Sequence, residues 1–75
     1  MITIQVHSNS TGKAVSGVKV SISKSGFLGS TIGPKITNKD GEAHFDIAPF
    51  TGKVYVDGKE VDSGFISGKK IVYKK

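Results

Sequence analysis

The chain has 75 residues, eleven of them lysine, with no arginine, no cysteine and a formal net charge of +5 at pH 7. A domain this short buries only about 60–65% of its unfolded surface, and the lack of cysteine excludes disulfides and thiolate zinc sites as support. Arginine supplies the planar fork that grips phosphate, so its absence argues against a nucleic-acid partner.

The sequence has no segment suited to entering a membrane. No apolar run approaches the roughly 20 residues that span a bilayer, and the residues after Met1 lack the pattern of a signal peptide. We therefore expect a soluble protein without membrane insertion. Its compartment and oligomeric state are left open by the sequence.

Apolar and polar residues alternate strictly in three stretches, 2–7, 18–24 and 42–47. A period of two places one set of side chains in a core and the other in water, so each stretch predicts a half-buried β-strand. Nine apolar side chains are expected to point inward: Ile2, Ile4, Val6, Val18, Val20, Ile22, Ala43, Phe45 and Ile47.

Two segments near these strands carry turn residues. Residues 8–17 form a polar connection rich in serine, threonine and glycine. Residues 25–30 predict a loop with Phe27 and Leu28 at its tip, because glycines flank both apolar residues.

A further strand is predicted around residues 32–36, where Ile32, Pro34 and Ile36 share one parity. Proline has no amide proton for a ladder, so this strand is expected to be short and to lie at a sheet edge. The run that follows, 38–41 (NKDG), predicts a turn in which glycine takes the left-handed conformation.

The pair Asp57-Gly58 predicts a two-residue hairpin turn of type I′. Loop length then fixes the pairing, which is Val56 with Lys59, Tyr55 with Glu60, Val54 with Val61, and Lys53 with Asp62. Glycine bends at Gly64 and Gly68 precede a last strand over 70–74. With no helical period anywhere, these elements predict a single all-β domain over residues 1–75, with about seven short antiparallel strands.

Two segments resemble a known family. Residues 12–22, GKAVSGVKVSI, look like the opening G-x-x-V-x-G-V-x-V-x-V of carboxypeptidase regulatory-like, transthyretin-like domains. Residues 37–45, TNKDGEAHF, are similar to the T-D-x-x-G-x-F-x-F hairpin of that family, with Asn38 where aspartate is commoner. Both side chains can bond the turn amides. The resemblance covers roughly residues 2–47.

This resemblance implies a seven-stranded Greek-key sandwich of the immunoglobulin or prealbumin-like type. Domains of this kind usually serve as non-catalytic accessory modules beside enzymes, transporters or adhesins. Related surface modules carry a lysine–asparagine isopeptide bond, but the last strand here, 70–74, has no asparagine or aspartate. We therefore expect no enzyme activity and no cofactor.

Candidate catalytic and metal-binding residues are few. A hydrolytic triad would draw on His7, His44 and Asp46, but His44 and Asp46 lie two apart on one strand, about 6.5–7 Å from each other. Glu42 shares their face, and one histidine with two spaced carboxylates is a weak metal set. Residues 63–70 superficially resemble a phosphate loop. They lack the first glycine and the terminal Ser/Thr of that motif, and no helix is predicted to follow them. We expect neither a catalytic nor a metal site.

A contact surface is the more plausible functional feature. The candidates are Phe27, Leu28, Phe50, Lys53 and Tyr55. Tyr55 has the outward parity of Lys53, whereas Phe27, Leu28 and Phe50 could either cap the ends of the core or form a contact patch. The favoured hypothesis is an interaction module that binds another protein or a neighbouring domain.

The alternative hypothesis is a small five-stranded barrel that binds single-stranded nucleic acid through Tyr55 and lysines. Carbohydrate binding would use the same exposed ring without needing the lysines. Nucleic-acid binding of the stacking type requires several aromatic side chains on one outward face. Only Tyr55 has that parity in the sequence.

Overall fold

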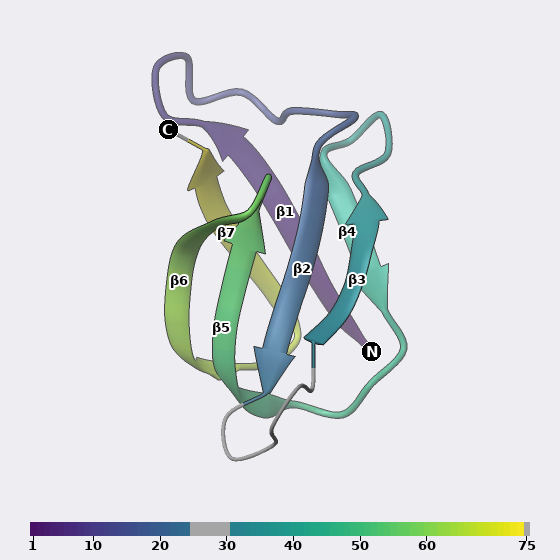
Figure 1. Ribbon diagram of the computed structural model, residues 1–75. Helices are drawn as coiled ribbons and strands as arrows, with labels where there is room; N and C mark the ends of the chain where they lie inside the picture. Colours follow the sequence, from purple (N-terminus) through teal and green to yellow (C-terminus); the bar gives the residue numbers. More distant parts are fainter. Residues whose placement is uncertain (25–30, 75) are drawn as a thin grey trace.

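The computed structural model describes residues 1–24 and 31–74, and these residues form seven strands and no helix (Figure 1). The prediction of an all-β chain with about seven strands is confirmed. No helix of the described residues is long and apolar enough to cross a membrane. The strands are β1 Ile2–Ser8, β2 Lys19–Lys24, β3 Thr31–Ile36, β4 Glu42–Phe45, β5 Phe50–Val56, β6 Lys59–Ile66 and β7 Lys69–Lys74.

The strands form two separate sheets, one of three strands in the order β4-β1-β7 and one of four in the order β3-β2-β5-β6. The alternative hypothesis expects one five-stranded barrel, whereas the described strands form these two sheets. All pairs are antiparallel except β1 with β7, which run in the same direction in Figure 1. The expectation of purely antiparallel pairing is therefore wrong for β7, because the chain crosses from the four-stranded to the three-stranded sheet before β7 begins.

The two sheets share one hydrophobic core. Eight of the nine predicted inward side chains are buried, and Ile47 is partly buried against them, so the parity prediction is confirmed. Phe45 is the largest fully buried side chain. The C-terminal half adds five more buried apolar residues: Phe50, Val54, Val56, Ile66 and Val72.

Strand β3 lies at an edge of the four-stranded sheet, as Pro34 predicts. The predicted parity of Ile32, Pro34 and Ile36 is wrong, because the register shifts where Gly33 and Pro34 together lie across from Ser21. This bulge leaves Ile32 against the core and Ile36 56% exposed. An extra residue in an edge strand reverses the faces of the residues that follow it.

The hairpin between β5 and β6 begins as predicted. Asp57 and Gly58 have φ values of 51° and 83°, which a type I′ turn requires. Beyond the first two pairs, the predicted register is wrong, because β6 carries a bulge at Val61 that pairs Val54 with Asp62 and Lys53 with Ser63.

Several strand boundaries also differ from the prediction. Strand β4 ends at Phe45 instead of residue 47, and β5 already begins at Phe50. Gly64, with φ 111°, lies inside the continuous strand β6 and does not interrupt it. It pairs with Gly52, and a side chain at Gly52 would collide with the carbonyl of Ser23.

The two motifs of the family resemblance pack against each other. The hydroxyl of Thr37, a buried polar side chain, donates to the Val15 carbonyl at 2.9 Å and accepts from the Val18 amide at 3.1 Å. The Asn38 side chain accepts from the amides of Asp40 and Glu42 at 2.9 and 3.1 Å, as expected for asparagine in this turn. These contacts fix where β2 begins relative to the β3–β4 turn.

Candidate functional site

The lysines of the last strand are engaged within the fold. Lys69 lies 3.3 Å from a Glu42 oxygen, Lys70 lies 3.2 Å from Asp62, and Lys74 lies 3.1 Å from Asp57. Exposed pairs of this kind contribute little individually. Together they tie β7 to β4, β6 and the β5–β6 turn, so much of the basic C-terminal segment already faces acids of the same chain.

Asp57 connects three parts of the molecule. Its amide donates to the Lys19 carbonyl at 2.9 Å, one carboxylate oxygen accepts from the Lys19 amide at 3.2 Å, and the other contacts Lys74. The Lys19 amide, and then the Lys74 ammonium, hold the pKa of the Asp57 carboxyl below its ordinary value of 3.8. The carboxylate therefore acts as a structural anion.

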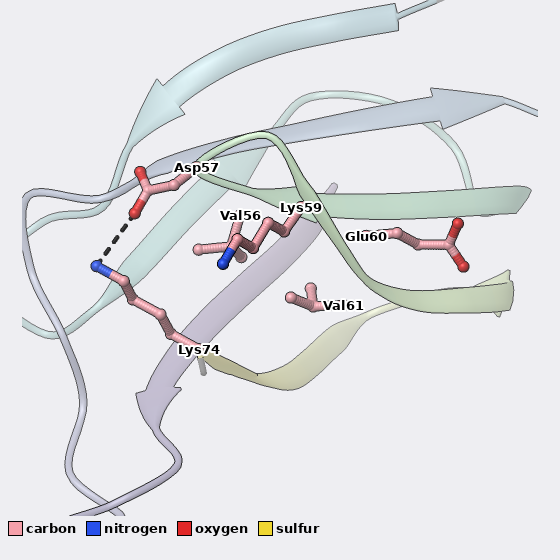
Figure 2. Close-up of a pocket in the computed structure, with 6 residues that line it drawn as sticks. All are labelled: Val56, Asp57, Lys59, Glu60, Val61 and Lys74. Carbon is pink, nitrogen blue, oxygen red and sulfur yellow. Dashed lines mark ion pairs between the residues drawn. The ribbon is translucent and has the colours of Figure 1, made fainter.

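A hollow of about 350 Å³ lies beside this anchor, where the β5–β6 turn approaches the end of β7 (Figure 2). Its polar groups are two lysines and two carboxylates, and no hydroxyl or imidazole lines it. The charges therefore balance. The residues that line it are Val56, Asp57, Lys59, Glu60, Val61 and Lys74.

Two predicted contact residues, Lys53 and Tyr55, lie together on the outer face of β5. Lys53 forms an ion pair with Glu60 at 3.3 Å, and Tyr55 is half-buried directly across from Glu60. Both residues line an open hollow of about 370 Å³ on the four-stranded sheet. Its other side chains are short hydroxyls and a lysine: Ser23, Lys24, Thr51 and Ser63.

Of the other predicted contact residues the structure describes only Phe50, which does not join this surface. Phe50 is only 8% exposed, because it begins β5 across from Ile66 and packs into the core. Of the two roles expected for Phe50, capping the end of the core and forming a contact patch, its burial fits the first. Little of the ring is left exposed for a partner. Phe27 and Leu28 fall within residues 25–30, outside the described residues.

Phe65 was missed by the sequence reasoning. It is 66% exposed and pairs with Thr51, so its ring lies on the same outer face as Lys53 and Tyr55. The outward direction of the Phe65 side chain could have been predicted only by placing the bulge at Val61 correctly. In a strand without that bulge, Phe65 would lie on the opposite face, toward the core.

The candidate catalytic histidines lie on the outer face of the three-stranded sheet. His44 Nδ1 is 2.9 Å from the Thr3 hydroxyl, and His44 Nε2 is 3.7 Å from a Glu42 oxygen. The second distance is too long for a hydrogen bond, and the His44 side chain is 46% exposed. His7 instead packs its ring edge-to-face against Tyr73 at 5.9 Å.

Metal ligands are not gathered in the part of the chain that the structure describes. Among residues 1–24 and 31–74, no group of three or more histidine, aspartate or glutamate side chains could hold a metal ion. Asp46 lies after the end of β4, so the strand no longer holds it in line with Glu42 and His44.

Comparison of the chain with protein-family models, with curated proteins and with solved structures finds no match.

Proposed function

We propose that this chain is a non-catalytic β-sandwich module that makes contacts with another protein or a neighbouring domain. Its strands would be connected in Greek-key order, as in immunoglobulin- and prealbumin-like domains. Support comes from the shared core of the two sheets and from the packing of the two family-like motifs through Thr37. Among the described residues, His44 contacts the Thr3 hydroxyl, but Glu42 lies 3.7 Å from the other ring nitrogen, too far to orient the ring by a hydrogen bond. This arrangement favours a binding role over a catalytic one.

The contact surface of this module is the outer face of β5 and β6. The observation that carries the proposal is Phe65, a large apolar side chain that is two-thirds exposed next to Thr51, a residue lining the Lys53 and Tyr55 hollow. Exposed aromatic rings beside polar groups are typical of interface anchors.

The partner would present an apolar side chain to Phe65 and a carboxylate to Lys53. The net charge of +5 favours an acidic partner surface, since charge complementarity accelerates encounter and disfavours wrong partners. Lys53 is already paired with Glu60, and an incoming carboxylate would share that lysine from the open side of the sheet.

A photo-cross-linking amino acid at position 65 tests this proposal in cells that produce the protein. We expect one discrete adduct whose mass exceeds that of the chain and whose yield falls when Lys53 is replaced by glutamate. The same amino acid at Ile36, 56% exposed on β3 of the same sheet, is the matched control. Equal adducts at both positions, or none at position 65, would contradict the proposed surface.

The same hollow gives carbohydrate binding as a second candidate. Three hydroxyl-bearing side chains, those of Ser23, Thr51 and Ser63, line it together with the Tyr55 ring. An aromatic face with convergent hydroxyl groups suits a sugar ring. Titration with neutral oligosaccharides, followed by tyrosine fluorescence and by amide shifts around Tyr55, separates this candidate from the protein-contact proposal, which expects no saturable change.

A further inference from the structure

Among the strands that the structure describes, β7 is an open edge of the three-stranded sheet. It pairs with β1 on one side only, and the carbonyls of Gly68 and Lys74 accept from the amides of Thr3 and Asn9 at 2.9 Å. Because successive residues of a strand direct their backbone groups to opposite sides, the even-numbered residues of β7 bond to β1. The amides and carbonyls of the odd-numbered residues between them therefore point to the open side.

The open edge also carries exposed apolar side chains. Ile71 is 45% exposed and Tyr73 is 53% exposed, and both lie on the outer face of the sheet. A hollow of about 290 Å³ runs along β7 and is bounded on its other side by Val61 and Asp62 of β6. A strand edge with free backbone groups and exposed apolar residues is a template for pairing with another chain.

Lysines normally protect such an edge by charge. Here the three lysines of β7, Lys69, Lys70 and Lys74, are each held by an acid of the same chain. Their charges are thus partly compensated, and the middle of the strand, Ile71 to Tyr73, carries no charge at all.

We propose that β7 is a dimerisation edge that pairs antiparallel with β7 of a second copy, with Ile71 directly across from Ile71 of that copy. The pairing joins two three-stranded sheets into one sheet of six strands around a two-fold axis, so each copy contributes the same surface. This contact lies on the opposite sheet from the Phe65 surface and does not depend on the proposed function.

Avoidance of contacts between lysines selects this register. Centring the pair on Ile71 places Lys69 across from Tyr73 of the second copy, where the ammonium can lie near the ring, and Lys70 across from Val72. Shifting the centre to position 70 places Lys70 across from Lys70 of the second copy. Shifting it to position 72 places Lys70 across from Lys74 of the second copy. Centred on Ile71, the two Lys70 side chains meet only diagonally, and each is held by its own Asp62.

The electrostatics give the dimer a salt dependence. Each copy carries a net charge of +5, so the two copies repel at long range. Added salt screens this repulsion, and the apolar pairing of Ile71 is not weakened by it. Dimerisation through β7 is therefore stronger at high ionic strength, the reverse of an association through opposite charges.

Analytical ultracentrifugation of the unmodified chain tests the proposal, at concentrations up to about 1 mM, the range of weak specific association. We expect a monomer–dimer equilibrium that shifts toward dimer as sodium chloride is raised. Ile71→Lys places two lysines across from each other and should give a monomer at every salt concentration. The control, Ile36→Lys, changes an exposed isoleucine on the other sheet and should leave the dimer intact.

A wild-type chain that stays monomeric at high salt would overturn the proposal and leave the edge to a different protein. A dimer that persists in Ile71→Lys would overturn it as well, because another surface must then form the contact. Circular dichroism and urea unfolding of both variants show whether they are folded, so loss of the dimer can be distinguished from loss of the fold.

The register has its own test because the chain lacks cysteine. Directly opposed residues in a hydrogen-bonded antiparallel pair lie about 5.5 Å apart at Cα, within disulfide range. Ile71→Cys should therefore form a disulfide-linked dimer on mild oxidation much faster than Ile36→Cys. A mixture of Lys69→Cys and Tyr73→Cys should form mainly the mixed dimer. Self-linked Lys69→Cys forming equally fast would contradict this register.

Discussion

Asp57 and Lys19 are joined by two reciprocal hydrogen bonds. The Asp57 amide donates to the Lys19 carbonyl at 2.9 Å, and the Lys19 amide donates to the Asp57 carboxylate at 3.2 Å. The side chain of Asp57 thus takes the place of a backbone carbonyl and continues the β2–β5 ladder beyond the pair Val20 and Val56. The turn that reverses the chain between β5 and β6 also fixes where β2 begins.

The Asp57 carboxylate should make stability depend on pH. Its folded pKa is lowered, so its contribution is fully present above the unfolded pKa of about 4 and is lost as the pH falls through the folded value. Asp57→Asn removes the titrating group, while asparagine tolerates the φ of 51° and can still accept from the Lys19 amide. The stability difference between wild type and Asp57→Asn should therefore shrink as the pH falls from 7 to 3.

Urea unfolding at both pH values measures this effect. Lys74→Gln is the matched variant, because it removes the ion pair and keeps the Lys19 contact. Lys74→Gln should lose only part of the pH dependence of stability that Asp57→Asn loses, since the Lys19 amide is the larger cause of the lowered Asp57 pKa. A difference between wild type and Asp57→Asn that stays constant with pH would refute this account.

The phenylalanines provide a matched test of the core. Phe45 is 1% exposed between the two sheets, whereas Phe65 is 66% exposed on an outer face. Phe45→Ala should lower the free energy of unfolding by about 3–5 kcal/mol, a large part of the total stability of a small domain. Phe65→Ala should change it by about 0.5 kcal/mol or less. Similar losses in chemical denaturation would show that the burial of these two rings is misassigned.

Two glycines with positive φ separate backbone strain from steric exclusion. Gly58 has open space around it, so Gly58→Val is penalised by its φ of 83° alone and should cost more than about 1 kcal/mol. Gly58→Asn should cost less, because asparagine tolerates this conformation. At Gly41 a Cβ would lie 2.9 Å from the Ala14 Cβ and 3.0 Å from the Val6 carbonyl.

Alanine at each position gives the comparison. Both substitutions meet a positive φ, but only Gly41→Ala also forces the β1–β2 connection away from the β3–β4 turn. Thermal unfolding should therefore rank Gly41→Ala well below Gly58→Ala in stability. The reverse order would mean that the turn at Gly41 relaxes freely.

Local patterns predicted the parts of this fold that depend on neighbouring residues. Alternation placed the core side chains of β1 and β2, and Pro34 placed β3 at an edge. The bulge at Val61 escaped prediction because a two-residue turn fixes only the first pairs of a hairpin. Its effect is long-range, since the shifted Asp62 reaches Lys70 on the other sheet.

The candidate site was predicted in part for the same reason. The outward parity of Lys53 and Tyr55 follows from a regular strand, and the structure places both on one hollow. The burial of Phe50 and the exposure of Phe65 depend instead on where β5 begins and where β6 bulges. The parallel pairing of β1 with β7 joins the two ends of the chain, and no local pattern encodes it.

Titration with mixed single-stranded oligonucleotides distinguishes the interaction module from a nucleic-acid binder. Four lysines face acids of the same chain, at Lys53, Lys69, Lys70 and Lys74, so much of the basic charge is already compensated. We expect affinity on the order of 10⁻⁴ M or weaker at physiological salt, which disappears as salt rises because counterion release is its only source. A stacking platform would retain affinity at high salt and lose about 1–3 kcal/mol in Tyr55→Ala. Tyr73→Ala, on the other sheet, is the control, and salt-resistant amide shifts centred on Tyr55 would reverse the assignment in favour of nucleic acid.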